Sequence, residues 1–340
     1  MTHKIIHQTL AESYAIYHGD CVALATDMPD NSIDFSVYSP PFSSLYVYGD
    51  SEADMGNTDG DDHFLDQYRF LVREKLRATR PGRLSAVHIK DLVFYMNSNE
   101  EGASGIRPLS DAVTRLHLEE GWKLQCRVTI WRDPVLERSK TNAHGLLYKT
   151  FRTDASMCRV GMPEYVLVFR KWPKTEAEAA LVVPVEHPQA QAPLPIWQEL
   201  ASPVWPGRAA IWNYEGAIDI VGQDANAKSL TSGGRSGGGD YDLRSTDVLN
   251  VKQSRDPEAE KHLCPMPLNI SERAISLWSN KGDTVWSPFA GIGSEGVAAL
   301  KLGRRFIGSE LNPNYYHAAV NHLYATAKSG RQMSIFEVVA

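Results

Sequence analysis

An apolar strand that runs directly into a glycine turn and then a helix constrains this chain more than any other feature of its sequence. Residues 283–286 have the pattern of a strand, the turn Ser287–Gly293 has the sequence Ser-Pro-Phe-Ala-Gly-Ile-Gly, and residues 295–302 have a helical pattern. A strand over 305–307 and a helix over 313–327 complete a β-α-β-α unit. Units of this kind build open parallel sheets that bind ligands at the carboxyl ends of their strands.

The turn itself indicates what such a ligand contains. Gly291 and Gly293 let the backbone turn tightly and approach a ligand closely, and the N-terminus of the following helix favours a carboxylate or phosphate. Glu310 follows the next strand, where an acid can accept both hydroxyls of a ribose. A glycine pair alone is most often a plain tight turn, but the strand, the helix and Glu310 together predict a ligand that contains a nucleoside.

The rest of the chain continues the alternation of strands and helices. We expect strands over 13–17, 32–38, 84–89, 124–131 and 164–169, and helices over 21–28, 63–79, 108–120 and 268–279. Residues 173–258 are proline-rich and irregular, and they contain the glycine- and serine-rich run 232–239. A length of 340 residues suggests about two structural units.

A second motif, Ser39-Pro40-Pro41-Phe42, ends the strand predicted over 32–38. Taken alone, such a motif is most often a rigid Pro-Pro turn with a packed phenylalanine. Its functional interpretation is specific, because the Ser39 oxygen and the Pro40 carbonyl can each accept one N–H from a planar exocyclic amine. These bonds would draw the nitrogen towards tetrahedral geometry and stabilise the positive charge that develops on it. The two prolines fix the carbonyl, and Phe42 can stack on a base.

Together, the two motifs resemble those of the amino-group DNA methyltransferases that use S-adenosylmethionine (SAM). The signature of that family is a [DNS]-P-P-[YF] tetrad and an F-x-G-x-G loop, here Ser39–Phe42 and Phe289–Gly293, and the tetrad-first order resembles its permuted β class. The resemblance implies a Rossmann-like methyltransferase fold with a mostly parallel seven-stranded sheet flanked by helices, SAM as cofactor and double-stranded DNA as partner. It also implies site residues. The catalytic ones are Ser39, Pro40, Pro41 and Phe42, and those that bind SAM are Asp20, Phe289, Gly291, Gly293 and Glu310.

Further segments match the same family, so the resemblance covers about 1–172 and 259–327. It divides the chain into a catalytic half (1–172), a target-recognition insert (173–258) and a SAM-binding half (259–340). One position departs from the family pattern, because Ser287 stands where the family usually has Asp. If that acid helps to hold the methionine ammonium, Glu295 and Asp20 are the candidates to substitute for it.

The target base stays open at this point. Adenine N6 and cytosine N4 present the same geometry to Ser39. Within the family, a serine-led tetrad leans towards cytosine, whereas solitary bacterial methylases are more often adenine enzymes. We favour N6-adenine, with N4-cytosine as the alternative. Remoter alternatives are N-methylation of RNA or of a protein glutamine, and a catalytically inactive DNA-binding protein. Cys264 precedes Pro265, so the chain lacks the Pro-Cys nucleophile needed to attack cytosine C5.

The net charge of −6, from 35 basic and 41 acidic residues, excludes binding of nucleic acid by bulk charge. The charge is partitioned, however, since residues 50–62 carry six acids and no base, whereas residues 69–90 carry seven bases and one acid. DNA binding should therefore be local and salt-sensitive. Candidate phosphate contacts are Arg69, Arg73 and Arg77, which we interpret first as a solvated helix face, and Arg132, Arg138, Lys140, Lys149, Arg152 and Arg159.

Base readout is expected from residues 173–258. We interpret the tryptophans there (Trp197, Trp205 and Trp212) as local core, and the histidines His88, His144 and His262 as structural.

Other classes of protein are disfavoured. No run approaches 18 apolar residues, and residues 1–20 lack a signal-peptide core, so no membrane association or secretion is expected. The four cysteines form no C-x-x-C pair, so we expect no metal site. The family resemblance implies a cytoplasmic, nucleoid-associated enzyme of a bacterium or phage that is often a homodimer. No nuclease motif stands out, which favours a free-standing methylase.

Overall fold

The architecture comes from a computed structural model, which describes residues 5–42, 54–95, 104–132, 134, 137–138, 146–187, 194–205 and 266–337. Several sequence predictions lie outside the described residues: those for Lys140, His144, Trp212, His262, Cys264 and the run 232–239. Within the described ranges, no helix combines the length and the apolar character needed to cross a membrane.

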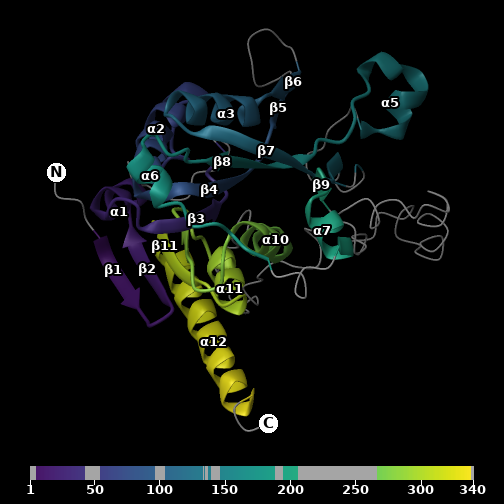
Figure 1. Ribbon diagram of the computed structural model, residues 1–340. Coiled ribbons are helices and arrows are strands. Elements are labelled where there is room, and N and C mark those ends of the chain that lie inside the picture. The colour runs from purple at the N-terminus through teal and green to yellow at the C-terminus, as the bar shows by residue number, and fades with distance from the viewer. Residues whose placement is uncertain are drawn as a thin grey trace. The chain divides into compact units, whose positions relative to one another are not determined.

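A nine-stranded sheet organises the described part of the chain (Figure 1). The strands lie in the order β1-β2-β11-β10-β3-β4-β8-β7-β9. Their bounds are Ile5–Leu10 (β1), Tyr14–Gly19 (β2), Ile33–Tyr38 (β3), Thr79–Lys90 (β4), Lys123–Ile130 (β7), Glu164–Arg170 (β8), Val204–Trp205 (β9), Thr284–Ser287 (β10) and Arg305–Glu310 (β11). The pairs β2/β11, β11/β10, β10/β3, β3/β4 and β7/β9 are parallel, whereas β1/β2 is antiparallel. Strands β5 (Leu92–Phe94) and β6 (Gly105–Arg107) form a separate antiparallel pair.

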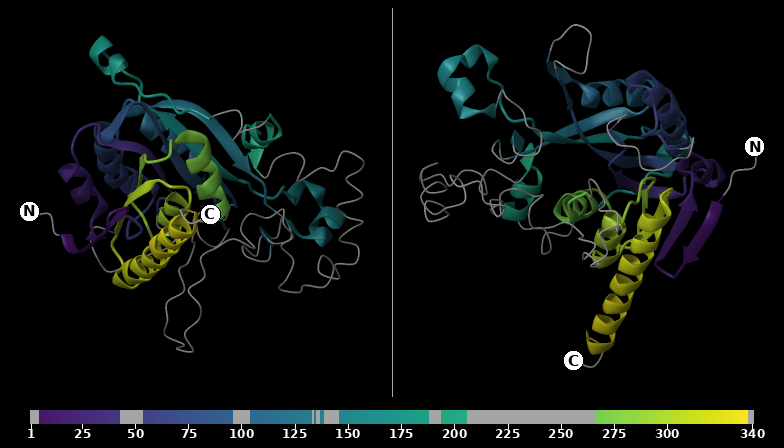
Figure 2. Two further views of the ribbon diagram at one scale, coloured as in Figure 1. Left: turned by 60° about the horizontal axis from the view of Figure 1, so that its bottom comes forward. Right: turned by 180° about the vertical axis from the view of Figure 1, so that it is seen from behind.

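Two groups of helices pack on the sheet. Helices α10 (Leu268–Trp278), α11 (Ser294–Lys301) and α12 (Pro313–Glu337) contact one another in sequence order, and α10 also contacts β3. Helices α1 (Cys21–Asp27), α2 (Asp61–Ala78) and α3 (Leu109–Glu119) form the second group. Figures 1 and 2 show the two groups on opposite faces of the sheet, as in a doubly wound α/β fold. The short helices are α5 (Tyr148–Thr153), η4 (Ala155–Met157), α6 (Glu176–Ala180) and α7 (Leu194–Leu200).

The predicted fold class is confirmed, and the predicted number of strands is corrected. The seven strands from β2 to β7 in the sheet order are those of the expected methyltransferase sheet, and the described residues add β1 at one edge and β9 at the other. Strand β1 lies mostly exposed and has no alternating pattern of buried residues, and β9 has only two residues, so neither leaves a periodic signal. Strand β4 begins at Thr79, directly after α2, and so starts five residues before the strand predicted over 84–89.

Helix α2 buries a lysine in its last turn. Its apolar spacing (Phe64, Tyr68, Leu71, Val72 and Leu76) predicts one buried face, and the first four are fully buried, but the last turn buries Lys75 while Leu76 is only half-buried. The Lys75 ammonium contacts the Tyr38 hydroxyl and lies 3.1 Å from Nε2 of His117. Desolvation lowers the pKa of Lys75 well below its ordinary value.

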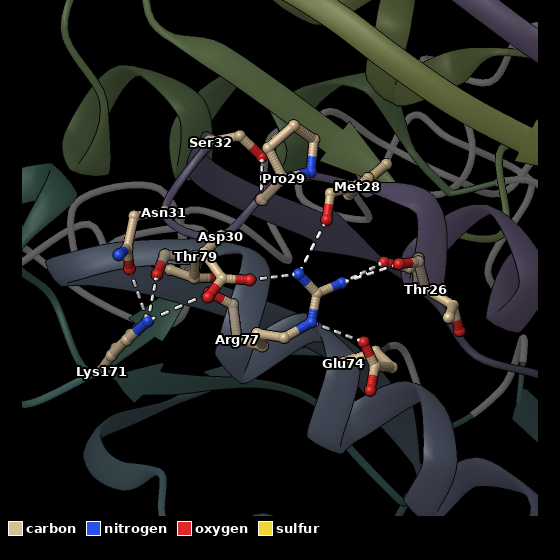
Figure 3. A network of polar contacts seen from close by, with 11 residues as sticks. Thr26, Met28, Pro29, Asp30, Asn31, Ser32, Glu74, Arg77, Thr79 and Lys171 are labelled. Carbon is tan, nitrogen blue, oxygen red and sulfur yellow. Dashed lines mark hydrogen bonds and ion pairs between the residues drawn. The ribbon is translucent and has the colours of Figure 1, made fainter.

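The arginines of α2 make ion pairs and hydrogen bonds within the protein. Arg77 donates to the backbone carbonyls of Ala25 and Met28, each at 2.8 Å, and pairs with Asp30 and with Glu74. Figure 3 shows its contacts with Met28, Asp30 and Glu74. Arg77 thereby satisfies carbonyls in the last turn of α1 and fixes the turn that leads into β3. Lys171 supports the same turn by donating to the Asn31 side chain at 2.8 Å (Figure 3).

Two further arginines of α2 are held by α3 and the residue that follows it. Arg69 pairs with Glu119 and Glu120, and Arg73 pairs with Glu120 at 2.7 Å. The arginine stripe is therefore partly exposed but paired with acids of the protein. The carboxylate partners of Arg69 and Arg73 lie about 50 residues away in sequence and could not be foreseen from the spacing.

The chain separates into two compact units. One comprises Met1–Cys126, Leu167–Glu186 and Val248–Ala340, and the other Arg127–Val166 and His187–Asp247. The first unit contains both sequence motifs. The division into a catalytic half, an insert at 173–258 and a SAM-binding half stays a prediction.

Candidate active site

The two sequence motifs meet at the carboxyl ends of adjacent strands. Strands β3 and β10 pair in parallel, with Phe35 opposite Val285 and Ser36 opposite Trp286. The tetrad follows β3 directly, and the glycine turn follows β10 directly. Strand β11 lies on the other side of β10, so Glu310 reaches the same edge of the sheet.

A cavity of about 420 Å³ opens at this edge. Eight of the nine predicted site residues line it: Asp20, Ser39, Pro40, Pro41, Phe42, Phe289, Gly291 and Glu310. Gly293 is not among the lining residues, although its neighbours Ile292 and Ser294 are. The described residues of its wall also include Glu295 and Asp54 but no lysine or arginine. The acids, and the absence of lysine and arginine among these residues, favour a cationic ligand.

The hydroxyl of Ser39 donates to the backbone carbonyl of His88, with an oxygen–oxygen distance of 3.0 Å. Since this bond uses the hydroxyl proton, the lone pairs of Ser39 Oγ remain available to accept hydrogen bonds from a ligand. Pro40, Pro41 and Phe42 are buried. The two prolines fix the backbone φ angles directly after Ser39, so the Ser39 oxygen lies at the cavity on a rigid turn.

Tyr38 connects the tetrad to the glycine turn. Its ring lies 5.8 Å from that of Phe289, and its hydroxyl lies 2.6 Å from that of Tyr68. Tyr38, the residue directly before Ser39, is therefore fixed by a contact with the glycine turn and by a hydrogen bond to α2.

The glycine turn needs both of its glycines. Gly291 and Gly293 have φ of 52° and 90°, values that favour glycine over residues with a side chain. A Cβ atom on Gly293 would also lie 3.3 Å from the backbone of Ala319 in α12. This close contact lets α11 begin at Ser294 and point its N-terminus towards the cavity edge.

Glu310 is fixed by two backbone amides. Its Oε2 accepts from the N–H of Gly291 and its Oε1 from the N–H of Asn312, each at 2.8 Å. Each oxygen keeps a lone pair, so the carboxylate can still accept from two neighbouring hydroxyls. Desolvation, and to a smaller extent the nearby charge of Asp54, raises the pKa of Glu310 to about 7, against the backbone hydrogen bonds that lower it.

Asp20 has a structural role that its sequence position did not reveal. It caps α1, with Oδ1 accepting from the N–H of Val22 at 3.0 Å and Oδ2 from the N–H of Ala23 at 3.2 Å. It lines the cavity, but both of its oxygens already accept backbone hydrogen bonds.

Sequence reasoning missed several residues of the cavity wall: His18, Asp54, Met55, Met266, Asn312 and Tyr315. Asn312 had a usable signal, because an asparagine before Pro313 is typical of a helix N-cap. Its side chain accepts from the N–H of Asn314 at 2.9 Å and so places the start of α12 beside Glu310. Among the residues that the structure describes, no cluster of three or more His, Cys, Asp or Glu has the arrangement of a metal site.

Three comparisons with known proteins bear on this site. A family model described as a DNA methylase, N6_N4_Mtase, matches residues 33–321. The DNA adenine methyltransferase YhdJ of Escherichia coli (strain K12) is 39% identical over 66 residues, which are 19% of this chain and 22% of YhdJ. The chain spans about a quarter of the length of the first curated relatives it matches, which are Type II methyltransferases (26%, 22% and 28%).

Two solved structures share the fold. TTHA0409 of Thermus thermophilus, solved in complex with S-adenosyl-L-methionine, has a TM-score of 0.57 and 18% identity, with 93% of this chain and 96% of that chain covered. The PvuII DNA methyltransferase (cytosine-N4-specific) has a TM-score of 0.53 and 17% identity, with 92% and 86% covered. At these identities the likeness establishes the arrangement of strands and helices.

Proposed function

Because the chain belongs to the N6-adenine/N4-cytosine family of DNA methylases, we propose that it transfers a methyl group from SAM to the exocyclic amine of a base in DNA. One observation carries this proposal. The tetrad and the glycine turn come from opposite ends of the sequence, yet both line a single cavity at the carboxyl ends of β3 and β10. This is the arrangement that a methyl donor and an amine acceptor require.

The cavity suits SAM in its charge and in its donor set. SAM supplies an electrophilic methyl group on a positively charged sulfonium. Glu310, held by Gly291 and Asn312, has two lone pairs for the ribose hydroxyls, and the acids of the wall attract a cation. Asp20, Phe289, Gly291, Gly293 and Glu310 are the residues that we propose hold the cofactor.

The tetrad residues prepare the amine. Ser39 Oγ, whose own proton is donated to His88, accepts one N–H, and the Pro40 carbonyl accepts the other. Together they localise the nitrogen lone pair and stabilise the positive charge that develops on nitrogen. Phe42 stacks on the base. Because a duplex buries its exocyclic amines, the target base is flipped out of the helix before it reaches Ser39.

For the target base we favour N6 of adenine, with N4 of cytosine as the alternative. The name of YhdJ, an adenine methyltransferase, supports the first. The serine at the head of the tetrad, which in the family leans towards cytosine, supports the second. Ser39 Oγ accepts an amine N–H from either base.

The wider expectations follow the same proposal. We propose that the chain is a permuted β-class enzyme that acts as a homodimer on DNA in the cytoplasm. Residues 173–258 read the DNA sequence, and exposed cations outside the arginine stripe contact the phosphates. Trp205 is fully buried and donates to the carbonyl of Leu200 at 3.1 Å, as expected of local core. Trp197 is exposed, so the same interpretation is wrong for Trp197.

The decisive experiment incubates the purified protein with methyl-labelled SAM and duplex DNA, and analyses the nucleosides by mass spectrometry. The expected product is N6-methyladenine, and N4-methylcytosine would select the alternative. Parallel reactions with RNA and with a protein lysate test the remoter substrates. If SAM binds but no labelled methyl enters DNA of any sequence, the proposed function is wrong.

A further inference from the structure

Glu295 is a buried acid in the wall of the cavity that the proposed chemistry has not used. It lies in the first turn of α11, directly after the glycine turn, and only 3% of its surface is exposed. It lines the cavity together with Glu310. A carboxyl group at such a depth is costly to ionise unless a cation lies beside it.

The described residues that line the cavity include no lysine or arginine that could supply such a cation. The histidine among them, His18, has its Nε2 3.1 Å from the carbonyl oxygen of Leu311. Desolvation and the nearby charge of Glu310 raise the pKa of Glu295 to about 8, while a hydrogen bond from its own backbone N–H opposes the rise. A ligand cation beside Glu295 would offset the cost of ionising it.

Other side chains that could hold a cationic group are less suited. Ser287, which stands where the family usually has an acid, is fully buried with an unpartnered Oγ, and it is not among the residues that line the cavity. Both oxygens of Asp20 cap α1. The lone pairs that the backbone bonds of Glu310 leave are the ones we propose accept the two ribose hydroxyls.

Asp54 is the remaining acid of the wall. Its Oδ1 accepts from the N–H of Gly56 at 2.8 Å, and its charge acts on Glu310. It therefore belongs to the Glu310 side of the cavity, where the ribose is expected.

We propose that Glu295 binds the α-ammonium group of SAM and so replaces the acid that is missing at position 287. This inference depends on SAM being the cofactor. Through this ion pair the cavity would distinguish ligands that carry the amino-acid end of SAM from truncated nucleosides.

The test measures binding by calorimetry with three ligands that differ at defined groups. SAM carries both the sulfonium and the ammonium, S-adenosylhomocysteine carries only the ammonium, and 5′-methylthioadenosine carries neither. In the Glu295→Gln variant, SAM and S-adenosylhomocysteine should both bind roughly 10- to 100-fold more weakly, whereas the affinity for 5′-methylthioadenosine should not change. Asp54→Asn is the matched control, since it neutralises another buried acid of the same cavity and should affect all three ligands alike.

A second measurement uses the unmodified protein and does not depend on a variant that folds. At pH 7 Glu295 is mostly protonated in the free protein, so pairing with an ammonium releases a proton. The number of protons released follows from binding enthalpies in buffers with different ionisation enthalpies. We expect release on binding SAM or S-adenosylhomocysteine, and less release with 5′-methylthioadenosine.

The outcomes separate this inference from the proposed function. If the unmodified protein does not bind SAM, the proposed function fails. If SAM binds and Glu295→Gln leaves its affinity unchanged, Glu295 is not the ammonium ligand. Weakening of SAM alone would assign Glu295 to the sulfonium, and equal weakening of all three ligands would mean that it only shapes the cavity. Either result overturns the inference.

Discussion

Ser39 and Glu310 illustrate how single residues acquire their chemistry from backbone groups that sequence does not reveal. The motif predicts that Ser39 accepts a hydrogen bond, but its ability to do so depends on the His88 carbonyl, 49 residues away, which takes its proton. Glu310 similarly depends on the N–H groups of Gly291 and Asn312. At this scale the sequence predicted which residues line the cavity, but not the backbone partners that fix their orientation.

Replacing Ser39 with alanine should slow methyl transfer by roughly 100- to 1,000-fold, because one of the two acceptors for the amine is lost. The dissociation constant of SAM should stay nearly unchanged. Single-turnover rates and calorimetry measure the two quantities separately. Ser36→Ala is the matched control, since Ser36 is a fully buried serine on β3, the strand that leads to Ser39, and its Oγ has no hydrogen-bond partner among the described residues. Equal losses of rate and of SAM affinity in Ser39→Ala would contradict the assigned role.

The affinity for SAM should fall as the pH is lowered from 8 to 6. The pKa of Glu310 is raised to about 7, so the ionised carboxylate that accepts two hydroxyls is lost as the pH falls through that value. A single group with this pKa weakens binding by about tenfold at pH 6. Glu310→Gln, which cannot titrate, should bind more weakly and lose the part of this dependence that is due to Glu310, so that the remaining part reports Glu295, whose pKa is raised to about 8. A constant affinity of the unmodified protein over this range would contradict the role of Glu310.

Among the elements, helix α2 shows why the pattern of a helix face can be misinterpreted. The spacing of Arg69, Arg73 and Arg77 predicts one exposed face of α2, and all three do lie on it. Their acidic partners outside α2 lie at the end of α3 and in the turns that follow α1 and α3. The arginines therefore connect α2 to these neighbouring elements. The periodic patterns predicted most strands and helices correctly, whereas β1, β9 and the burial of Lys75 depend on tertiary contacts that leave no periodic signal.

Arg77→Ala should destabilise the fold by roughly 2 kcal/mol, because carbonyls in the last turn of α1 lose their donor. Chemical denaturation at neutral pH measures the effect. Arg73→Ala is the control on the same helix, one turn earlier, and it should have little effect because its side chain is largely exposed and pairs only with Glu120. If the two variants lose the same stability, Arg77 does not anchor the turn.

For the whole molecule, the net charge of −6 has to be reconciled with a polyanionic partner. Internal ion pairs neutralise part of the excess positive charge of residues 69–90. Among the other candidate phosphate contacts, Arg159 pairs with Glu137 and Arg132 pairs with Glu164. Lys149 and Arg152 on α5 are exposed, and so are their neighbours Tyr148 and Phe151. Among the candidate phosphate contacts that the structure describes, these two cations on an aromatic surface best fit a nucleic acid.

The double variant Lys149→Ala/Arg152→Ala should therefore weaken DNA binding and lower the slope of log affinity against log salt by roughly 2, while SAM binding is unchanged. The matched control is Lys281→Ala/Arg305→Ala, which removes two exposed cations at the amino ends of β10 and β11, away from the cavity edge. Fluorescence anisotropy with a labelled duplex at several salt concentrations measures both pairs. An unchanged slope in the first variant would exclude α5 from the DNA interface.

The pairing of β3 with β10 also determines the order in which the molecule can be completed during synthesis. Strand β3 leaves the ribosome early and pairs with β4, but its other edge stays open until β10 has been made. An open edge of a buried strand can pair with other chains, so nascent chains of this protein should depend on chaperones during that interval. The cavity cannot form before the last β-α-β segment docks, and a prematurely terminated chain would contain the tetrad without any means of binding the methyl donor.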